Sequence, residues 1–164
     1  MRGGSLLKIT TSKRIAARAG DVWRVLEDFG SFYRVNPLLE CSPVVNGVTR
    51  GIGAERECKF YDGSMIRERI TAVRAGESME IAITASSLPI RDGRVVIAVV
   101  HEDAEHSRVT FDATITLKFG VLGRLLGLVM RPVLTSQFNL VLRGIATYLA
   151  TGKTVGPRTA LLAI

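Results

Sequence analysis

The middle of the chain, from Cys41 to Phe119, is divided into short segments by a series of turn signals. These signals are rich in glycine, asparagine and aspartate, and they are Val45-Asn46-Gly47, Tyr61-Asp62-Gly63-Ser64, Ala75-Gly76-Glu77, Arg91-Asp92-Gly93 and Asp103-Ala104-Glu105-His106. The segments between them predict strands over about residues 41–46, 53–61, 64–74, 78–88, 93–102 and 107–118. Because the connections are short, consecutive strands are expected to pair antiparallel.

A further strand and two helices are predicted before this region. Residues 6–18 alternate like a long first strand. An apolar helical stripe follows, formed by Val22, Val25, Leu26 and Phe29. Asp21 is placed to cap or charge the start of that helix, and Gly30 to end it. A second short helix is expected from Ser31 to Val35, before Asn36-Pro37 forces an extended or turning backbone.

The chain ends in a long helical pattern from about Pro132 to Ala150. Its apolar side chains share one face, and they are Leu134, Phe138, Val141, Leu142, Ile145 and Leu149. Pro132 suits the first turn of this helix or a kink. The order of elements predicts an α+β fold in which an antiparallel sheet wraps around a helix.

The length of 164 residues, with 47% hydrophobic and 23% charged residues, fits one folded domain. Residues 1–152 are expected to form this domain and residues 153–164 a loosely ordered tail. The N-terminus lacks the apolar stretch of a secretory signal, which predicts a cytoplasmic location. The window from Val121 to Leu134 carries two arginines and is too short and too charged to span a membrane, but it can cover a cavity or touch a membrane surface.

The two cysteines, Cys41 and Cys58, are expected to be reduced thiols, because a metal site needs clustered cysteines and histidines. A hairpin centred between Thr49 and Arg50 would place the two cysteines opposite each other. A disulfide is therefore the alternative.

One carboxylate lies on an otherwise apolar strand face. Alternation places Glu68 on the same face as Ile66, Ile70 and Ala72, where an unpaired charge would be costly. Its candidate partner is Arg56, which shares a face with Cys58 and Phe60, because a hairpin at Asp62-Gly63 brings residues near 57 opposite residues near 68. The pair predicts either an acid/base or hydrogen-bonding site in a cavity wall, or a structural ion pair near a strand end.

Several short motifs, in their shared order, resemble the START-like superfamily, also called SRPBCC or polyketide cyclase/dehydrase and lipid-transport proteins, in its small bacterial branch. The motifs are Ala19 to Phe29, Asn36-Pro37, Gly51-Ile52-Gly53, Ile66 to Ile70, Ser107 to Thr110, Lys118 to Gly123 and Met130-Arg131-Pro132. The resemblance covers about residues 6–153, and Val35 stands where the family usually has tryptophan. It implies a helix-grip fold like that of the birch pollen allergen: a seven-stranded sheet around the C-terminal helix, with a hydrophobic cavity between them.

The resemblance also implies where a ligand would bind. Tyr33 and Asn36 would lie near the cavity mouth, with a surface hydroxyl and a turn-capping amide as the alternative. The expected ligand-binding residues are Tyr33, Asn36, Cys58, Phe60, Glu68, Ile83, Phe138 and Leu142. Glu68 and Arg56 are the candidate catalytic residues, whereas Trp23 is expected to pack in the core.

Signatures of common catalytic sites are absent from the sequence. It has no Gly-x-Ser-x-Gly, P-loop, His-Glu-x-x-His or Cys-x-x-Cys motif, and Gly51-x-Gly53 lacks a third glycine. His101 and His106 are not spaced as a catalytic dyad and are expected to be solvated. Neither a metal nor another cofactor is therefore expected.

The net charge of +7 is concentrated at the two ends of the chain. Residues 1–20 hold five basic and no acidic side chains, and residues 113–164 hold six basic and none acidic. If the first strand pairs with the last, both segments share one side of the fold, which predicts contact with an anionic membrane surface. A merely solvated basic surface is the alternative, and nucleic acid is disfavoured because no long basic run or interleaved aromatic motif is present.

Three functions remain open from the sequence. The first is binding of a small or medium hydrophobic molecule, such as a lipid, isoprenoid or polyketide. The second is an enzyme of cyclase or dehydratase type that uses acid/base groups in the cavity. The third is an interaction protein whose cavity is filled by its own side chains.

Overall fold

The computed structural model describes residues 5–157, except for the surroundings of Gly120 and the side chain of Val121. In chain order its elements are β1 (Leu6–Ile15), α1 (Ala19–Glu27), the 3₁₀ helix η1 (Phe29–Arg34), β2 (Leu39–Cys41), β3 (Glu55–Phe60), β4 (Met65–Arg74), β5 (Ser78–Ser86), β6 (Ile90–His101), β7 (Ser107–Leu117) and α2 (Gly120–Thr151). The strands form one antiparallel sheet in the order β1-β7-β6-β5-β4-β3-β2. The predicted helix-grip α+β architecture is confirmed.

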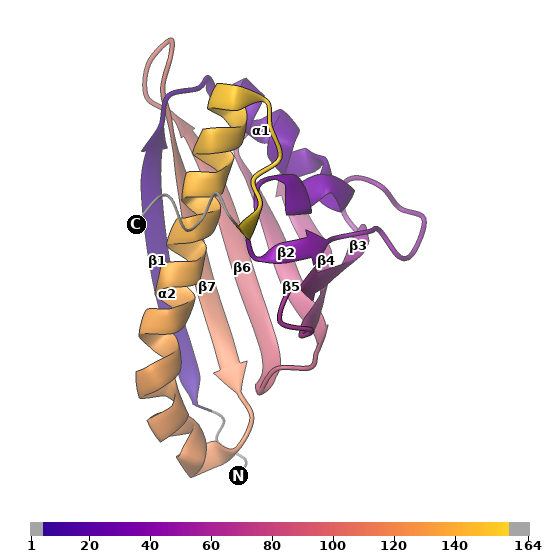
Figure 1. Ribbon diagram of the computed structural model, residues 1–164, viewed down its shortest axis with the longest axis vertical. Coiled ribbons are helices and arrows are strands. Elements are labelled where there is room, and N and C mark those ends of the chain that lie inside the picture. Colours follow the sequence, from indigo (N-terminus) through magenta and orange to yellow (C-terminus); the bar gives the residue numbers. More distant parts are fainter. Residues whose placement is uncertain (1–4, 158–164) are drawn as a thin grey trace.

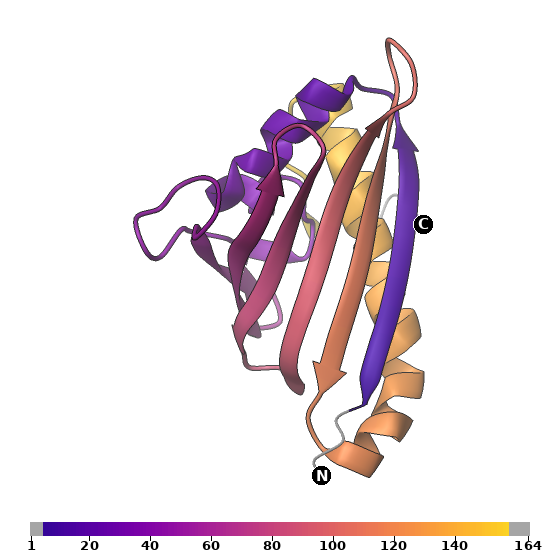
Figure 2. The same cartoon turned by 180° about the vertical axis from the view of Figure 1, so that it is seen from behind.

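The three helices lie on the same face of the sheet (Figure 1), and the view from behind shows the strands with no helix in front of them (Figure 2). α2 runs along β1, and α1 lies beside α2. The core fills the space between the sheet and the helices. Phe111 on β7 and Leu142 and Ile145 on α2 are almost completely buried there.

The end of α2 is followed by a short return of the chain. Gly152 takes a left-handed conformation and closes the helix. Val155 is buried, and its N–H donates a hydrogen bond to the Arg34 carbonyl at 2.9 Å. This part of the expected tail therefore packs on η1, whereas residues 158–164 lie outside the described residues.

The start of α2 differs from the prediction. The helix begins at Gly120 rather than near Pro132, so Pro132 lies inside it and not in its first turn. Proline has no N–H to donate to the carbonyl of residue 128. Both Pro132 and Leu128 are exposed, so water can reach that carbonyl in place of the missing donor.

The strand expected over residues 41–46 is also wrong in its bounds. β2 ends at Cys41, where the Ser42 hydroxyl donates to the Gly30 carbonyl and Pro43 has no N–H for a strand ladder. The expected strand is present in part beyond this break, because Val44 forms an isolated antiparallel bridge with Arg56 of β3. Cys41 pairs with Lys59, not with Cys58. A shift of one residue turns a side chain to the other face of a sheet. The two thiols accordingly remain separate and free.

Two further details of the sheet depart from simple alternation. Arg91-Asp92-Gly93 lies within β6 and is not a turn, because a Cβ at position 93 would come within 2.6 Å of Ile83 and glycine makes room for that side chain. The pairing of β4 with β5 shifts between Ile70 and Ala72. This irregularity turns Ala72 out to solvent, so it does not share the inner face with Glu68 as expected.

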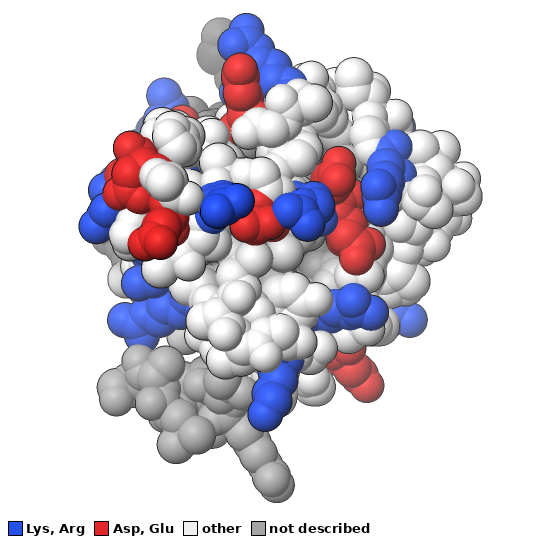
Figure 3. Space-filling model, turned by 90° about the horizontal axis from the view of Figure 1, so that it is seen from above, with Lys and Arg blue, Asp and Glu red and all other residues white. Residues whose placement is uncertain are grey.

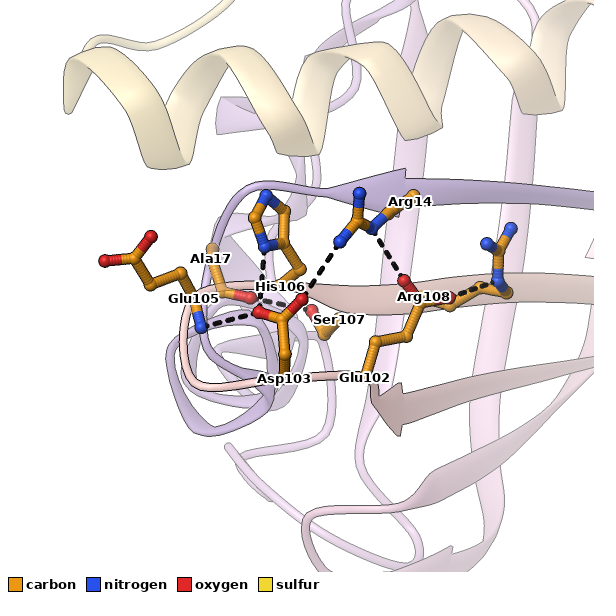
Figure 4. A network of polar contacts seen from close by, with 8 residues as sticks. All are labelled: Arg14, Ala17, Glu102, Asp103, Glu105, His106, Ser107 and Arg108. Carbon is orange, nitrogen blue, oxygen red and sulfur yellow. Dashed lines mark hydrogen bonds and ion pairs between the residues drawn. The ribbon is translucent and has the colours of Figure 1, made fainter.

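A polar network closes the β6–β7 connection and ties it to β1 (Figure 4). Arg14 donates to Glu102 at 2.8 Å and to Asp103 at 2.9 Å. The second oxygen of Asp103 accepts hydrogen bonds from the Glu105 backbone and is 2.8 Å from Nδ1 of His106. His106 keeps contact with solvent as expected, with a side chain that is 31% exposed, but its ring is also held by Asp103.

This network predicts a stability change at acidic pH. The Glu105 N–H and the His106 ring lower the pKa of Asp103 from 3.8 to about 2. A lowered carboxyl pKa stabilises the folded state above the ordinary pKa, and the gain is lost as the pH falls towards the folded value. Asp103→Asn should thus lower the melting temperature at pH 7, and the difference from wild type should shrink between pH 4 and pH 2. Equal differences at pH 7 and pH 2 would contradict this assignment.

Candidate functional site

A cavity of about 110 Å³ lies between the inner face of the sheet and α2. Most of its walls are aliphatic or aromatic. The lining side chains of this kind are Phe32, Leu38, Phe60, Ile66, Ile81, Ile83, Leu88, Ile90, Val95, Ile97, Phe111, Ile115, Leu134, Phe138 and Val141. Four polar side chains complete the lining: Asn36, Arg56, Glu68 and Gln137. A small set of polar groups in an apolar pocket is typical of ligand sites.

Arg56 and Glu68 form a buried ion pair at the wall of this cavity. The hairpin of β3 and β4 places the two residues directly opposite each other, as the Asp62-Gly63 turn predicted. Arg56 donates from Nη2 and Nε to one oxygen of Glu68, Oε2, at 2.6 and 2.8 Å. The side chains are only 3% and 17% exposed. Charge-assisted hydrogen bonds of this kind offset the cost of removing both groups from water.

The guanidinium of Arg56 is also fixed from the side of η1. Its Nη1 donates to the Phe29 carbonyl at 3.1 Å. Its Cζ lies 4.0 and 4.1 Å from the ring centroids of Phe29 and Phe32, which is cation–π geometry. Burial would lower the pKa of Arg56, but the neighbouring Glu68 and Cys58 together outweigh burial and raise that pKa. Arg56 is therefore a permanent cation that orients Glu68, and it is not a proton donor.

Glu68 lines the cavity and holds its partners with only one of its two carboxylate oxygens. Its Oε2 accepts hydrogen bonds from Arg56 and, at 3.6 Å, from the Cys58 thiol. In the part of the chain that the structure describes, no group hydrogen-bonds to the other oxygen, Oε1. A carboxylate held by one oxygen can accept a hydrogen bond or a proton from a bound molecule with the other.

Cys58 is unsuited to act as a nucleophile. Burial, together with the neighbouring Glu68 carboxylate, raises the pKa of its thiol well above the ordinary value. The thiolate is the reactive form, so a thiol with a raised pKa is inert at neutral pH. Its place in the structure is that of a hydrogen-bond donor to Glu68.

The structure brings most of the predicted site residues together. Asn36, Arg56, Phe60, Glu68, Ile83 and Phe138 all line the cavity. Three of the expected ligand-binding residues do not line the cavity, namely Tyr33, Cys58 and Leu142. The Tyr33 backbone N–H is hydrogen-bonded to the Ser42 hydroxyl, Cys58 donates to Glu68, and Leu142 is buried in the core.

Asn36 has a structural partner in addition to its place at the cavity. Its side-chain oxygen accepts a hydrogen bond from the Leu38 N–H at 3.0 Å. The turn-capping alternative for this amide is thus present in the structure. The same side chain is buried and lies in the cavity lining.

Gln137 is the polar lining residue that the sequence interpretation missed. It lies three residues after Leu134 and four before Val141, and both of these side chains also line the cavity. A polar residue at that spacing belongs to the same helix face as its apolar neighbours. This spacing is the sequence feature that could have identified Gln137 as a cavity residue. Among the described residues, no group of three or more metal-ligating side chains could hold a metal ion.

Comparison with known proteins gives the wider context. The model of the family described as polyketide cyclase / dehydrase and lipid transport matches residues 7–150. A search of curated protein sequences found no match. XoxI from Bacillus cereus has a solved structure that is 19% identical, with a TM-score of 0.74 over 88% of this chain and 96% of that one.

Two other solved structures show the same fold. A protein from Thermobifida fusca is 23% identical, with a TM-score of 0.68 over 87% of this chain and 92% of that one. Norcoclaurine synthase from Thalictrum flavum, solved with dopamine and hydroxybenzaldehyde, is 15% identical, with a TM-score of 0.70 over 92% of this chain and 90% of that one. Likeness at these identities concerns the fold.

Proposed function

Because the chain belongs to the polyketide cyclase / dehydrase and lipid transport family, we propose that it binds a small hydrophobic molecule in the cavity between the sheet and α2. The family match spans residues 7–150, which include every residue that lines the cavity. The proposed ligand-binding residues are Asn36, Phe60, Glu68, Ile83, Phe138 and Gln137. No cofactor enters the proposal, and a cytoplasmic location remains our expectation.

The observation that carries this proposal is the combination of apolar walls with one available carboxylate oxygen. A cavity of about 110 Å³ is below the roughly 300–1,000 Å³ of pockets for drug-sized ligands. It is closer to the roughly 150 Å³ cavity that takes benzene. The ligand that fits is one aromatic ring or a short branched chain, with a hydroxyl or N–H that donates to Glu68 Oε1. A longer lipid or polyketide would have to extend out of the cavity.

The first experiment is native mass spectrometry of freshly purified protein, followed by organic extraction and identification of the small molecules. We expect a co-purifying lipophilic molecule, or a thermal shift with phenol or indole that is larger than the shift with toluene, which has no donor. A ligand at one hundred times its Kd stabilises the folded state by about 2.7 kcal/mol. An apo mass with no shift for phenol, indole, toluene or decanoic acid would overturn the proposal and favour the filled-cavity interaction protein.

A cavity-filling variant makes this test specific. Ile66→Trp adds bulk to the cavity wall and should abolish the thermal shift with phenol and indole. Thr84→Trp adds the same ring at an exposed position of the neighbouring strand and should retain it. If both variants lose the shift to the same extent, the ligand does not occupy this cavity.

The free oxygen of Glu68 also favours a second candidate, an acid/base enzyme of cyclase or dehydratase type. In that case Glu68 would take or return a proton, while Arg56 would act as a positioning residue that holds the carboxylate in place. Glu68→Gln distinguishes the two functions once the bound molecule is identified. Binding alone predicts an affinity within about threefold of wild type, whereas an enzyme predicts lost turnover.

A further inference from the structure

The N-terminal half of α2 exposes a row of large apolar side chains, which we call the α2 patch. It consists of Phe119, Leu122, Leu125, Leu128, Val129 and Val133. Within the helix, Leu122, Leu125, Val129 and Val133 follow one another at three or four positions, and Leu128 comes three positions after Leu125, so they lie along one side. Leu122 is 70% exposed and Leu128 is 75% exposed. A contiguous exposed row of this kind marks an interaction surface more often than a solvated one.

The opposite side of this helical segment is built from small residues. Gly123 and Gly127 face β1 and the residue before it: a Cβ at position 127 would be 3.1 Å from the Leu7 side chain, and one at 123 would be 3.3 Å from Ser5. Close approach of this kind leaves no space for leucine side chains under the helix. A rotation of the helix would not bury the α2 patch, so its exposure is built into the packing.

Phe119 adds backbone strain to the same feature. It is the only non-glycine residue with a positive φ in the described part of the chain, at 78°. A left-handed conformation is unfavourable for a residue with a Cβ, and strained positions cluster where function requires them. Phe119 is 66% exposed and directly precedes the helix at the start of the row. The strain is therefore not explained by burial of the ring.

The charges around the α2 patch are all of one sign. Lys118, Arg124 and Arg131 border it, and the two arginines are seven residues apart, on one edge of the helix. None of the three has an ion-pair partner among residues 5–157, and residues 113–164 contain no acidic side chain. By contrast, the end of the molecule at α1 and the β6–β7 connection shows both signs side by side (Figure 3).

Within the described residues one helical stretch, Leu122–Thr151, is long and apolar enough to cross a membrane, and only 22% of its apolar segment is buried. This helical stretch is thus longer than the apolar window from Val121 to Leu134 that the sequence shows. The second half of the helix forms part of the hydrophobic core, however, because Val141, Leu142 and Ile145 are buried against the sheet. A crossing would remove them from that core, so only the first half is free to meet lipid.

We propose that the α2 patch docks on an anionic lipid bilayer, with the first half of α2 lying in the plane of the membrane–water boundary. Aliphatic side chains flanked by arginines are the composition of such interfacial helices. A symmetric contact with a second copy would bring the same cations together, and the C-terminal segment outside the described residues carries Arg158 and no acid. Anionic headgroups supply the complementary charge. The proposal does not depend on the identity of the cavity ligand.

Vesicle co-sedimentation of the full chain tests this surface, with phosphatidylcholine alone and with phosphatidylcholine and phosphatidylglycerol at 7:3. We expect binding to the anionic vesicles that Leu125→Ser with Leu128→Ser weakens at least about tenfold. Arg124→Gln with Arg131→Gln should weaken it by about fivefold per arginine on anionic vesicles only. Phe119→Gly should weaken binding while the melting temperature stays the same or rises, because it relieves the positive φ.

The matched control is Val48→Ser with Ile52→Ser, which removes two exposed apolar side chains from the β2–β3 connection. This variant should bind vesicles like wild type. The proposal is overturned if wild type binds neither vesicle, or if the control loses binding as the patch variant does. It is also overturned if sedimentation velocity shows a dimer that Leu125→Ser with Leu128→Ser dissociates, or if vesicles bind only after removal of residues 158–164.

Discussion

Replacing Gly144 with alanine is expected to lower the free energy of unfolding by about 3 kcal/mol or more. The new Cβ would lie 1.9 Å from the Val35 carbonyl oxygen and 3.3 Å from the Pro37 side chain. Since the nearest atom belongs to the backbone, the clash is relieved only by moving α2 away from the segment between η1 and β2. The measurement is urea unfolding at pH 7, followed by the fluorescence of Trp23, the single tryptophan, which is buried in the core.

Gly20→Ala is the matched control for this substitution. Gly20 lies in α1, and nothing is within 4 Å of the position that its Cβ would take. Alanine favours a helix over glycine, so this variant should be as stable as wild type or more stable by up to about 1 kcal/mol. An unfolding midpoint for Gly144→Ala equal to that of Gly20→Ala would refute the close packing of α2 on Val35.

Arg56→Met is the second substitution with a large expected effect. It leaves the Glu68 carboxylate without its cation inside the protein and leaves the Phe29 carbonyl without its donor. Removal of one member of a buried ion pair costs about 3–5 kcal/mol. Urea unfolding should therefore show a loss of this size at pH 7. The double variant Arg56→Met with Glu68→Leu should recover much of it, because no uncompensated charge remains.

Arg94→Met is the control, since Arg94 pairs with Glu80 on the outer face of the sheet, where the two side chains are 59% and 27% exposed. Exposed ion pairs contribute about 0–1 kcal/mol. If Arg56→Met and Arg94→Met cost the same, the Arg56–Glu68 pair is better solvated than the structure indicates. If the double variant is no more stable than Arg56→Met, the aromatic contacts of Arg56 matter more than its charge.

The hairpin that carries the ion pair was predictable because its information is local. Asp62-Gly63 defines the turn, the strand period of two defines the faces, and together they placed Arg56 opposite Glu68. The turn expected at residues 91–93 failed for a non-local reason. Gly93 is required by the size of Ile83 on the neighbouring strand, and no pattern within β6 contains that information.

The misplaced site residues have equally specific causes. The helix η1 is broken at Ser31, whose backbone is not helical, so that Phe29 and Phe32, on either side of the break, both face Arg56. Tyr33 does not line the cavity. The sequence predicted a helix there but not its type. Gln137, by contrast, lies at helical spacing from Leu134 and Val141, so its place at the cavity was predictable from the sequence.

The sheet also has two edges, and they differ in how they are protected against strand addition. β2, at one edge, is only three residues long, which offers little template for another chain. β1, at the other edge, runs for ten residues with one side unpaired. An antiparallel pair of β1 strands centred on Thr11 would bring Lys8 of one copy opposite Arg14 of the other on the outer face of the sheet. Like-charge repulsion therefore disfavours this edge-to-edge register.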